Sequence, residues 1–194
     1  MLTSINPLGE RIRGNRWLLT TAWLTLGGVI GGAVLGVVAG AVGLLVADGL
    51  SVSVRLAILV ILFFAAAMWD LSGRRFPGRR QVNENWLTTY RSWVYGLGFG
   101  VQLGVGFTTV VFTALVPVML VAAALVDSLV AATAIGVVFG ATRGLVVLVS
   151  VAVRTPADLR ALHRRLDEYD LRVRRAGALS ALGLGVVAAA ALGI

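Results

Sequence analysis

The chain has 194 residues, of which 58% are hydrophobic and 13% charged, whereas soluble domains have about 45–50% and about 25%. Together with a mean hydropathy of +0.92, this predicts a surface that faces lipid and excludes an ordinary water-soluble domain. The chain has no cysteine and one histidine, which excludes a thiol relay, a disulfide framework and a multi-histidine or cysteine-ligated metal site within it. The net charge of +8 reflects where the arginines lie along a membrane protein, and nucleic acid is not an expected partner.

A short basic segment, residues 1–16, precedes the first apolar run, residues 17–47. This run is far longer than the hydrophobic part of a cleavable signal peptide, and no small-residue cleavage site follows it. We therefore expect a retained membrane anchor.

Glycine recurs at every fourth position of the first run. In water each glycine inside a helix costs about 0.5–1 kcal/mol relative to alanine, but in lipid it allows helix backbones to approach closely. The same spacing occurs in the third and fourth runs, so we expect three helices to pack together through Gly28, Gly32, Gly36, Gly40, Gly96, Gly100, Gly104, Gly136, Gly140 and Gly144. The pattern fits a tightly packed bundle, or else seams that slide or expose backbone carbonyls to a substrate.

The rest of the chain alternates between apolar and charged stretches. The second apolar run is 56–71, and a cytoplasmic loop is expected at 73–91. The third run, 92–126, contains Pro117, which predicts a kink. The fourth run is 128–153, a charged stretch occupies 155–175, and a last span is expected at 176–194. Because a span needs about 20 apolar residues, we expect about five passes.

The arginines predict how these passes are oriented. Fifteen of the seventeen lie before the first span, between spans two and three, or between spans four and five. The positive-inside rule then puts the N-terminus in the cytoplasm and the C-terminus outside, in what we expect to be a bacterial inner membrane. Spans one and three must each cross once, so they are expected to be tilted, broken or partly re-entrant.

A weak internal repeat is also present. A shift of 76 residues places Trp17 on Trp93 and Gly28 on Gly104, with a long glycine-rich run followed by a shorter one in each half. Transporter folds are often built from such repeats, with the site at the repeat interface.

Arg143 is the most informative polar residue. It lies eleven residues before Arg154, about 16 Å along a helix, which predicts a position near mid-membrane and a partner inside the protein. Gln102 is expected at a similar depth, followed by Thr108 and Thr109, and Asp70 is the nearest carboxylate. Arg143 could be a structural clamp between spans two, three and four, or part of an anion-binding or gating site.

Residues 155–175 predict an amphipathic helix on the cytoplasmic side. Thr155 and Asp158 form a capping box around Pro156. Apolar residues then follow at alternating steps of three and four: Leu159, Leu162, Leu166, Tyr169 and Val173. This helix could lie on the anionic inner leaflet or dock a partner subunit or a second copy.

The stretch YGLGFGVQLGVGFTTVVFTALVPVML resembles the second long, broken helix of the cytochrome c biogenesis membrane domains, thiol electron conduits related to lysine exporters. The matching residues are Gly96, Gly98 and Phe99. The resemblance implies a similar helical membrane fold. The family's proline–cysteine pair is replaced here by GFTTVV, so no electron relay and no catalytic residue follow from it.

The sequence therefore predicts an all-α polytopic membrane bundle that forms a single domain. Its expected function is transport or export of a small solute, for which an anion is one candidate. The alternative is a non-catalytic accessory subunit of a larger membrane complex that docks through the glycine seams and the 155–175 helix. No complete catalytic motif is present, so we expect neither an enzyme nor a cofactor. The expected partners are membrane lipid and either another membrane subunit or a second copy of the chain.

Overall fold

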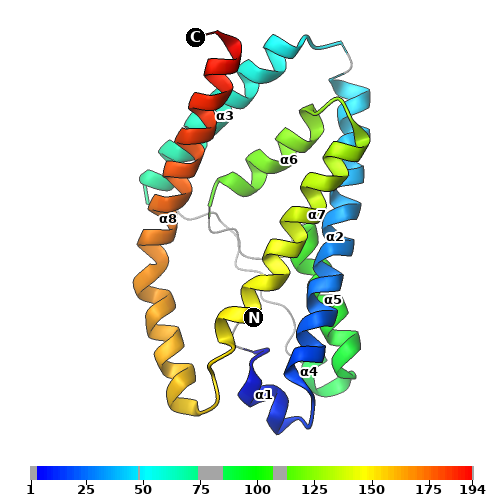
Figure 1. The fold of residues 1–194 in the computed structure, drawn as a ribbon, viewed down its shortest axis with the longest axis vertical. Helices are drawn as coiled ribbons and strands as arrows, with labels where there is room; N and C mark the ends of the chain where they lie inside the picture. Colours follow the sequence, from blue (N-terminus) through cyan, green and yellow to red (C-terminus); the bar gives the residue numbers. More distant parts are fainter. Residues whose placement is uncertain (1–3, 48, 74–84, 107–112, 194) are drawn as a thin grey trace. The chain divides into compact units, whose positions relative to one another are not determined.

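The computed structural model describes residues 4–47, 49–73, 85–106 and 113–193, and every regular element in these ranges is a helix (Figure 1). In chain order these elements are α1 (Pro7–Ile12), α2 (Trp17–Val46), α3 (Val52–Leu71), α4 (Trp86–Thr89), α5 (Ser92–Val105), α6 (Leu115–Leu125), α7 (Leu129–Leu145), the 3₁₀ helix η1 (Val146–Ser150) and α8 (Pro156–Leu192). The expectation of an all-α fold is confirmed for these residues.

Four helices in the described chain are long and apolar enough to cross a membrane. They are Trp17–Val46, Val52–Leu71, Leu129–Ser150 and Leu171–Leu192. This is the composition of a multi-pass membrane protein. The helix Leu115–Leu125 is also apolar but shorter, and the count of five passes stays a prediction.

The chain divides into two compact units. Unit 1 contains the described residues of Met1–Leu35, Arg79–Val110 and Gly136–Glu168. Unit 2 contains those of Gly36–Gly78, Val111–Ile135 and Tyr169–Ile194. Helices α2, α7 and α8 each contribute residues to both units.

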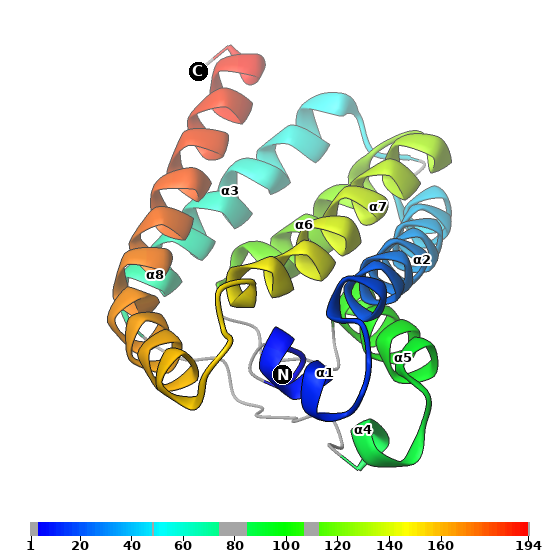
Figure 2. The same cartoon turned by 60° about the horizontal axis from the view of Figure 1, so that its bottom comes forward.

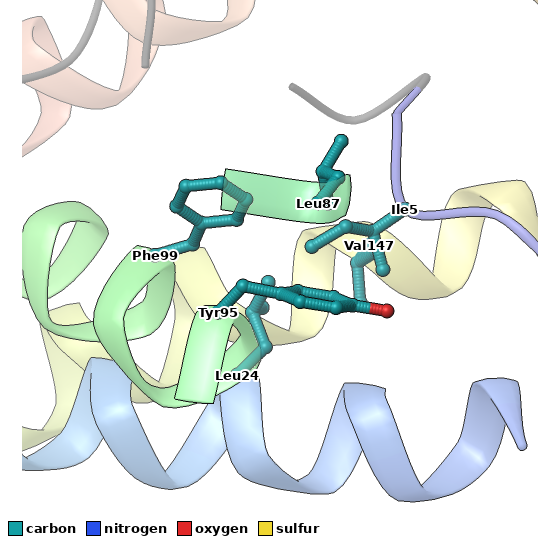
Figure 3. Packing of buried hydrophobic residues seen from close by; sticks show 6 residues of the cluster. All are labelled: Ile5, Leu24, Leu87, Tyr95, Phe99 and Val147. Carbon is teal, nitrogen blue, oxygen red and sulfur yellow. The ribbon is translucent and has the colours of Figure 1, made fainter. Parts of the chain in front are cut away.

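The core of unit 1 is built around two aromatic residues of α5. Tyr95 and Phe99 are almost completely buried, and they pack with Leu24 of α2, Leu87 of α4 and Val147 of η1 (Figure 3). Ile5, which precedes α1, completes this cluster. Ile5, near the start of the described residues, is therefore anchored in the interior of unit 1.

Glycine sets how closely the helices of unit 1 approach. A Cβ added to Gly100 of α5 would overlap the carbonyl oxygen of Leu24, and one added to Gly104 would overlap that of Gly28. On the α7 side, a Cβ at Gly140 would overlap the carbonyl oxygen of Gly28. Because α5 and α7 both meet α2 at glycine, the three backbones lie side by side within unit 1 (Figure 2), and a Cβ at these glycines would overlap backbone atoms of the neighbouring helix.

Unit 2 is also packed through small residues. Its buried cluster includes Ala66 and Ala67 of α3 and Ala178 and Ala181 of α8, with Val118 of α6. The second half of α2 meets the first part of α7 where Gly36 approaches Ala132 and Thr133. Gly40 approaches Ala132 and Leu129 in the same way.

The third apolar run is not one long helix. Helix α5 ends at Val105, and Gly106 follows it with a φ of 75°, a left-handed conformation that glycine adopts readily. Helix α6 begins at Leu115, so Pro117 lies in its first turn, where the missing N–H costs little. Of the alternatives that the sequence left open for this run, the described residues show the broken form. The kink expected at Pro117 is replaced by a break before it.

The boundary expected between a helix at 155–175 and a last span at 176–194 is not present. Helix α8 runs without interruption from Pro156 to Leu192. No residue between the two segments breaks a helix, since Arg174, Arg175 and Ala176 all favour helix. The two predicted elements are therefore consecutive parts of one helix.

Candidate functional site

The most completely buried charged group in the described chain is Glu10 of α1, whose exposed fraction is 0%. Asn6 caps α1 by accepting a hydrogen bond from the backbone N–H of Gly9 at 2.8 Å, and Pro7 is at the first helical position. This short helix turns Glu10 inward, toward α2 and α5.

Three side chains hold the carboxylate of Glu10. The hydroxyl of Tyr95 donates to Oε2 at 2.6 Å, and the hydroxyl of Thr20 donates to the same oxygen at 2.9 Å. Arg13 donates to Oε1 at 2.5 Å. Asn15 completes the cluster by donating to the Tyr95 hydroxyl at 3.0 Å. We call these five residues the Glu10 cluster.

The electrostatics of the Glu10 cluster are those of a compensated buried charge. Burial by itself would lower the pKa of Arg13, but the hydrogen bond and the charge of Glu10, together with Tyr95, outweigh it and raise the pKa of Arg13 above its ordinary value. A buried carboxylate is tolerated only when it is paired and hydrogen-bonded in this way. The cluster therefore ties α1 to α2 and α5 through hydrogen bonds that Thr20 and Tyr95 donate to the carboxylate.

The Glu10 cluster was not predicted from the sequence. Glu10 lies among the arginines of a segment that was expected to be a solvated cytoplasmic end, and Tyr95 is 85 residues away. A local signal for α1 was nonetheless present, because Asn6 followed by Pro7 is a helix-start signature.

Arg143, the main predicted site residue, lies in the last turn of α7, directly before η1. It is partly buried, and its guanidinium carbon is 5.3 Å from the centroid of the Phe139 ring. The edge of this ring lies against Gly106, where α5 ends. A cation is favourable at a helix C-terminus. The structure therefore places Arg143 one helical turn from the residue that packs on the break after α5.

The other predicted residues of this site are only partly brought together. Gln102 is partly buried on α5, one turn before Gly106, and so belongs to unit 1 with Arg143. Thr108 and Thr109 lie outside the described residues. Asp70 belongs to unit 2, so its pairing with Arg143 stays a prediction.

Asp70 has its own surroundings in unit 2. It lies at the end of α3, its exposed fraction is 4%, and its Oδ1 accepts a hydrogen bond from the backbone N–H of Ala114 at 2.9 Å. Ala114 directly precedes α6, so the carboxylate is placed at the positive end of that helix. Arg174 of α8, also buried, is close enough for its charge to act on Asp70.

Arg55, which was not among the predicted site residues, lies in the first turn of α3, at the opposite end from Asp70. It donates to the carbonyl oxygens of Ala47 at 2.9 Å and Leu50 at 3.1 Å. It also reaches the carbonyl oxygen of Leu125 at 3.5 Å and pairs with Asp127 at 3.3 Å. Arg55 therefore holds the chain segments that join α2 to α3 and α6 to α7.

The predicted helix-packing glycines occupy close contacts within each unit. A Cβ added to Gly32 would overlap the carbonyl oxygen of Gly136, and one added to Gly144 would lie 2.8 Å from the Cα of Thr25. A Cβ at Gly96 would lie 3.0 Å from the carbonyl oxygen of Thr20. Whether these contacts are what keeps the helices associated in a bilayer stays a prediction.

Two further features bear on chemistry. Among the described residues, no group of three or more His, Cys, Asp or Glu side chains is arranged to hold a metal ion.

An apolar groove of about 230 Å³ in unit 2 lies between α3 and α6 and is lined by Leu62, Ala65, Ala66, Trp69, Ala114, Pro117, Val118 and Val121. Its lining suits hydrocarbon better than a polar solute.

Comparison with known proteins gives one informative likeness. The methylamine utilization protein MauF of Paracoccus versutus is 29% identical to this chain over 172 residues. The aligned region covers 86% of this chain and 63% of MauF, so the chain spans less than two thirds of that relative. No family model matches the chain, and no solved structure matches it.

Proposed function

We propose that this chain is an accessory, non-catalytic membrane component of a system that allows a cell to use a small amine. The observation that carries the proposal is the alignment with MauF, a protein named for methylamine utilization, over 86% of the chain. An alignment of that extent takes in most of the helical membrane architecture and does not rest on one short motif.

The local geometry supports an architectural role. The carboxylate of Glu10 is bonded to Arg13, Thr20 and Tyr95. The guanidinium of Arg55 donates hydrogen bonds to backbone carbonyl oxygens. Both groups join helices to one another. Charged groups that bond helices and their connecting segments to one another fix the arrangement of those helices. A subunit that docks on another protein needs such a fixed arrangement.

The proposal includes a topology. We infer five crossings, the third of them made by the apolar run 92–126. The N-terminus is then cytoplasmic and the C-terminus outside, in the inner membrane of a bacterium. The arginine distribution and the broken third run support this arrangement.

A broken third helix also supports the fold relationship proposed from the sequence. The run containing Gly96, Gly98 and Phe99 resembles the second long, broken helix of the cytochrome c biogenesis membrane domains, which are related to lysine exporters, and α5 ends soon after it at Val105. We propose common ancestry of fold with those domains. No electron transfer by this chain is proposed, because it contains no cysteine.

The accessory role is tested by deleting the gene in its host and growing the strain on methylamine or on ammonium as the nitrogen source. We expect growth on methylamine to fail, growth on ammonium to be normal, and entry of radiolabelled methylamine into the cells to be unchanged. The intact gene supplied in trans should restore growth. Normal growth of the deletion strain on methylamine would overturn the proposal.

A second candidate function is transport of a small anionic solute, and the observation that favours it is the position of Arg143 near the break after α5. Broken helices often form the sites of transporters, and an arginine suits a carboxylate or phosphate. The test is efflux of small carboxylates and phosphate from proteoliposomes that contain the purified chain. Arg143→Ala should abolish the flux, Arg175→Ala at an exposed position should keep it, and absence of flux with the intact chain would exclude this function for these solutes.

A further inference from the structure

The segment of residues 4–15, which we call the N-terminal latch, lies in unit 1 with three of its side chains directed inward. The exposed fractions are 1% for Ile5, 4% for Asn6 and 0% for Glu10. Ile5 packs with Tyr95 and Val147, as Figure 3 shows, and its carbonyl oxygen accepts a hydrogen bond from the buried hydroxyl of Ser150 at 3.4 Å.

Local structure alone cannot hold the latch in place. Helix α1 has six residues, fewer than a helix needs to persist in isolation. What holds it is one apolar anchor, Ile5, and the hydrogen bonds of the Glu10 cluster. Two hydrogen bonds to the Glu10 carboxylate, one from Asn15 to the Tyr95 hydroxyl and the packing of Ile5 therefore attach the latch to α2 and α5.

A buried charge network of this kind is weak evidence for stability. A well-packed apolar contact often does as well, and such networks are best attested in register and switching roles. Loss of the Glu10 carboxylate would remove one hydrogen bond to α2 and one to α5 at once, because Thr20 and Tyr95 both donate to the same carboxylate oxygen.

Polar atoms lie unsatisfied close to where the latch is attached. Thr21 Oγ1 and Trp17 Nε1 are buried and make no hydrogen bond within the described chain. They are one turn apart on the same face of α2, and Trp17 packs on the cluster that contains Ile5. A buried donor without a partner costs about 1–3 kcal/mol, so water or a polar ligand reaching these atoms would favour an open state.

We propose that the N-terminal latch is a movable cap on unit 1 that the Glu10 cluster holds closed. Release of the carboxylate frees the latch and admits water to the face of α2 that carries Trp17 and Thr21. The proposal is independent of the accessory and transport functions above, because it concerns access to the interior of unit 1 and not what the protein serves.

The experiment uses a cysteine reporter, which the cysteine-free sequence allows without background. Thr21→Cys is a suitable reporter, since its hydroxyl makes no hydrogen bond that the substitution would break. The full chain in membrane vesicles is labelled with a water-soluble maleimide, and the labelling rate is compared with and without Tyr95→Phe or Glu10→Gln.

We expect Thr21→Cys to react slowly in the otherwise intact chain and at least tenfold faster when Tyr95→Phe or Glu10→Gln is present. A matched reporter at Ile12→Cys, a latch position with 77% exposure, should react at the same rate in every background. A second reporter at Ala178→Cys, fully buried in unit 2, should stay protected in every background.

Two results would overturn the proposal. The first is an unchanged, slow reaction of Thr21→Cys in both variants, which would mean that the Glu10 cluster does not control access. The second is exposure of Ala178→Cys together with Thr21→Cys, which would mean that the cluster holds the whole fold and not a separate cap. Tyr95→Phe, which removes a single hydroxyl, keeps the test decisive if Glu10→Gln fails to fold.

Discussion

Charged residues in the described interior act mainly on backbone and on one another. Arg55 shows this most clearly, because its guanidinium reaches three backbone carbonyl oxygens from two connecting segments, at Ala47, Leu50 and Leu125. Carbonyls left unpaired at the end of a helix cost free energy when they are buried, and a planar guanidinium with five donors can satisfy several at once.

We therefore expect Arg55→Gln to lower the stability of the protein by about 1.5–3 kcal/mol, the value of hydrogen bonds to a charged group. Thermal unfolding in detergent, followed by tryptophan fluorescence, measures the change. Asp127→Asn is the matched control: its carboxylate is 69% exposed, so the expected loss is only about 0–1 kcal/mol. Equal losses in the two variants would contradict this assignment.

The start of α8 predicts a dependence on pH. The backbone N–H groups of Arg154 and Thr155 donate to the carboxylate of Asp158, and Thr155 accepts from the N–H of Asp158. These bonds, that from the N–H of Arg154 first, lower the pKa of Asp158 below its ordinary value of 3.8. Because the folded-state pKa is lowered, the stabilisation is complete above pH 3.8 and is lost as the pH falls through the folded-state value.

Asp158→Ala should consequently lower the melting temperature at pH 7 and leave it unchanged at a pH well below 3. Melting curves followed by circular dichroism at the two pH values give the comparison. A loss of the same size at both would show that the carboxylate charge has no part in the cap.

At the scale of the helices, glycine residues lie where α5 and α7 approach α2 most closely within unit 1. The spacing of Gly28, Gly32 and Gly140 predicted close packing because any larger side chain would keep two backbones apart. The structure gives the partners, with α5 and α7 both lying against α2 within unit 1.

The prediction at this scale is that Gly32→Ala separates α2 from α7. Its new Cβ would overlap the carbonyl oxygen of Gly136, and overpacking of this kind typically costs about 1–3 kcal/mol. Gly183→Ala on α8 is the control, because no described atom beyond its chain neighbours and its own stretch of helix backbone lies within 4 Å of its Cβ position, and alanine favours helix by about 0.5–1 kcal/mol. Unfolding in detergent should therefore show a loss for Gly32→Ala and none for Gly183→Ala.

The sequence predicted the helical class and the multi-pass membrane character, because both depend on the composition and pattern of neighbouring residues. It did not predict the Glu10 cluster, because the contact between Glu10 and Tyr95 joins residues 85 positions apart. The break after Gly106 was left open for a related reason: glycine at that position permits both a helix and a left-handed turn, and only the surrounding contacts decide between them.

At the scale of the whole molecule, the proposed topology predicts which surface positions can be reached from each side. Ile12, in the latch, should be cytoplasmic, and Ser51, between α2 and α3, should lie outside. Single cysteines at these two exposed positions, labelled in intact cells with a membrane-impermeant maleimide, test this directly. Labelling of Ser51→Cys without Ile12→Cys is expected, and the reverse pattern would invert the orientation.

The proposal of an accessory role concerns what surrounds the chain in the membrane. The likeness to MauF covers most of this chain but less than two thirds of that protein. The accessory role is therefore tested by asking which proteins accompany this chain in its native membrane. A docking component should leave the membrane with its partner, whereas a transporter that works alone should leave as a monomer or a homo-oligomer.

The most direct measurement is extraction of the protein from its native membrane, at its own expression level, in a mild detergent. The particle is then sized by light scattering, and its proteins are identified by mass spectrometry. Our account predicts a particle well above the 20.3 kDa of this chain that contains a second protein in a fixed ratio. A particle that contains only this chain would contradict the accessory role.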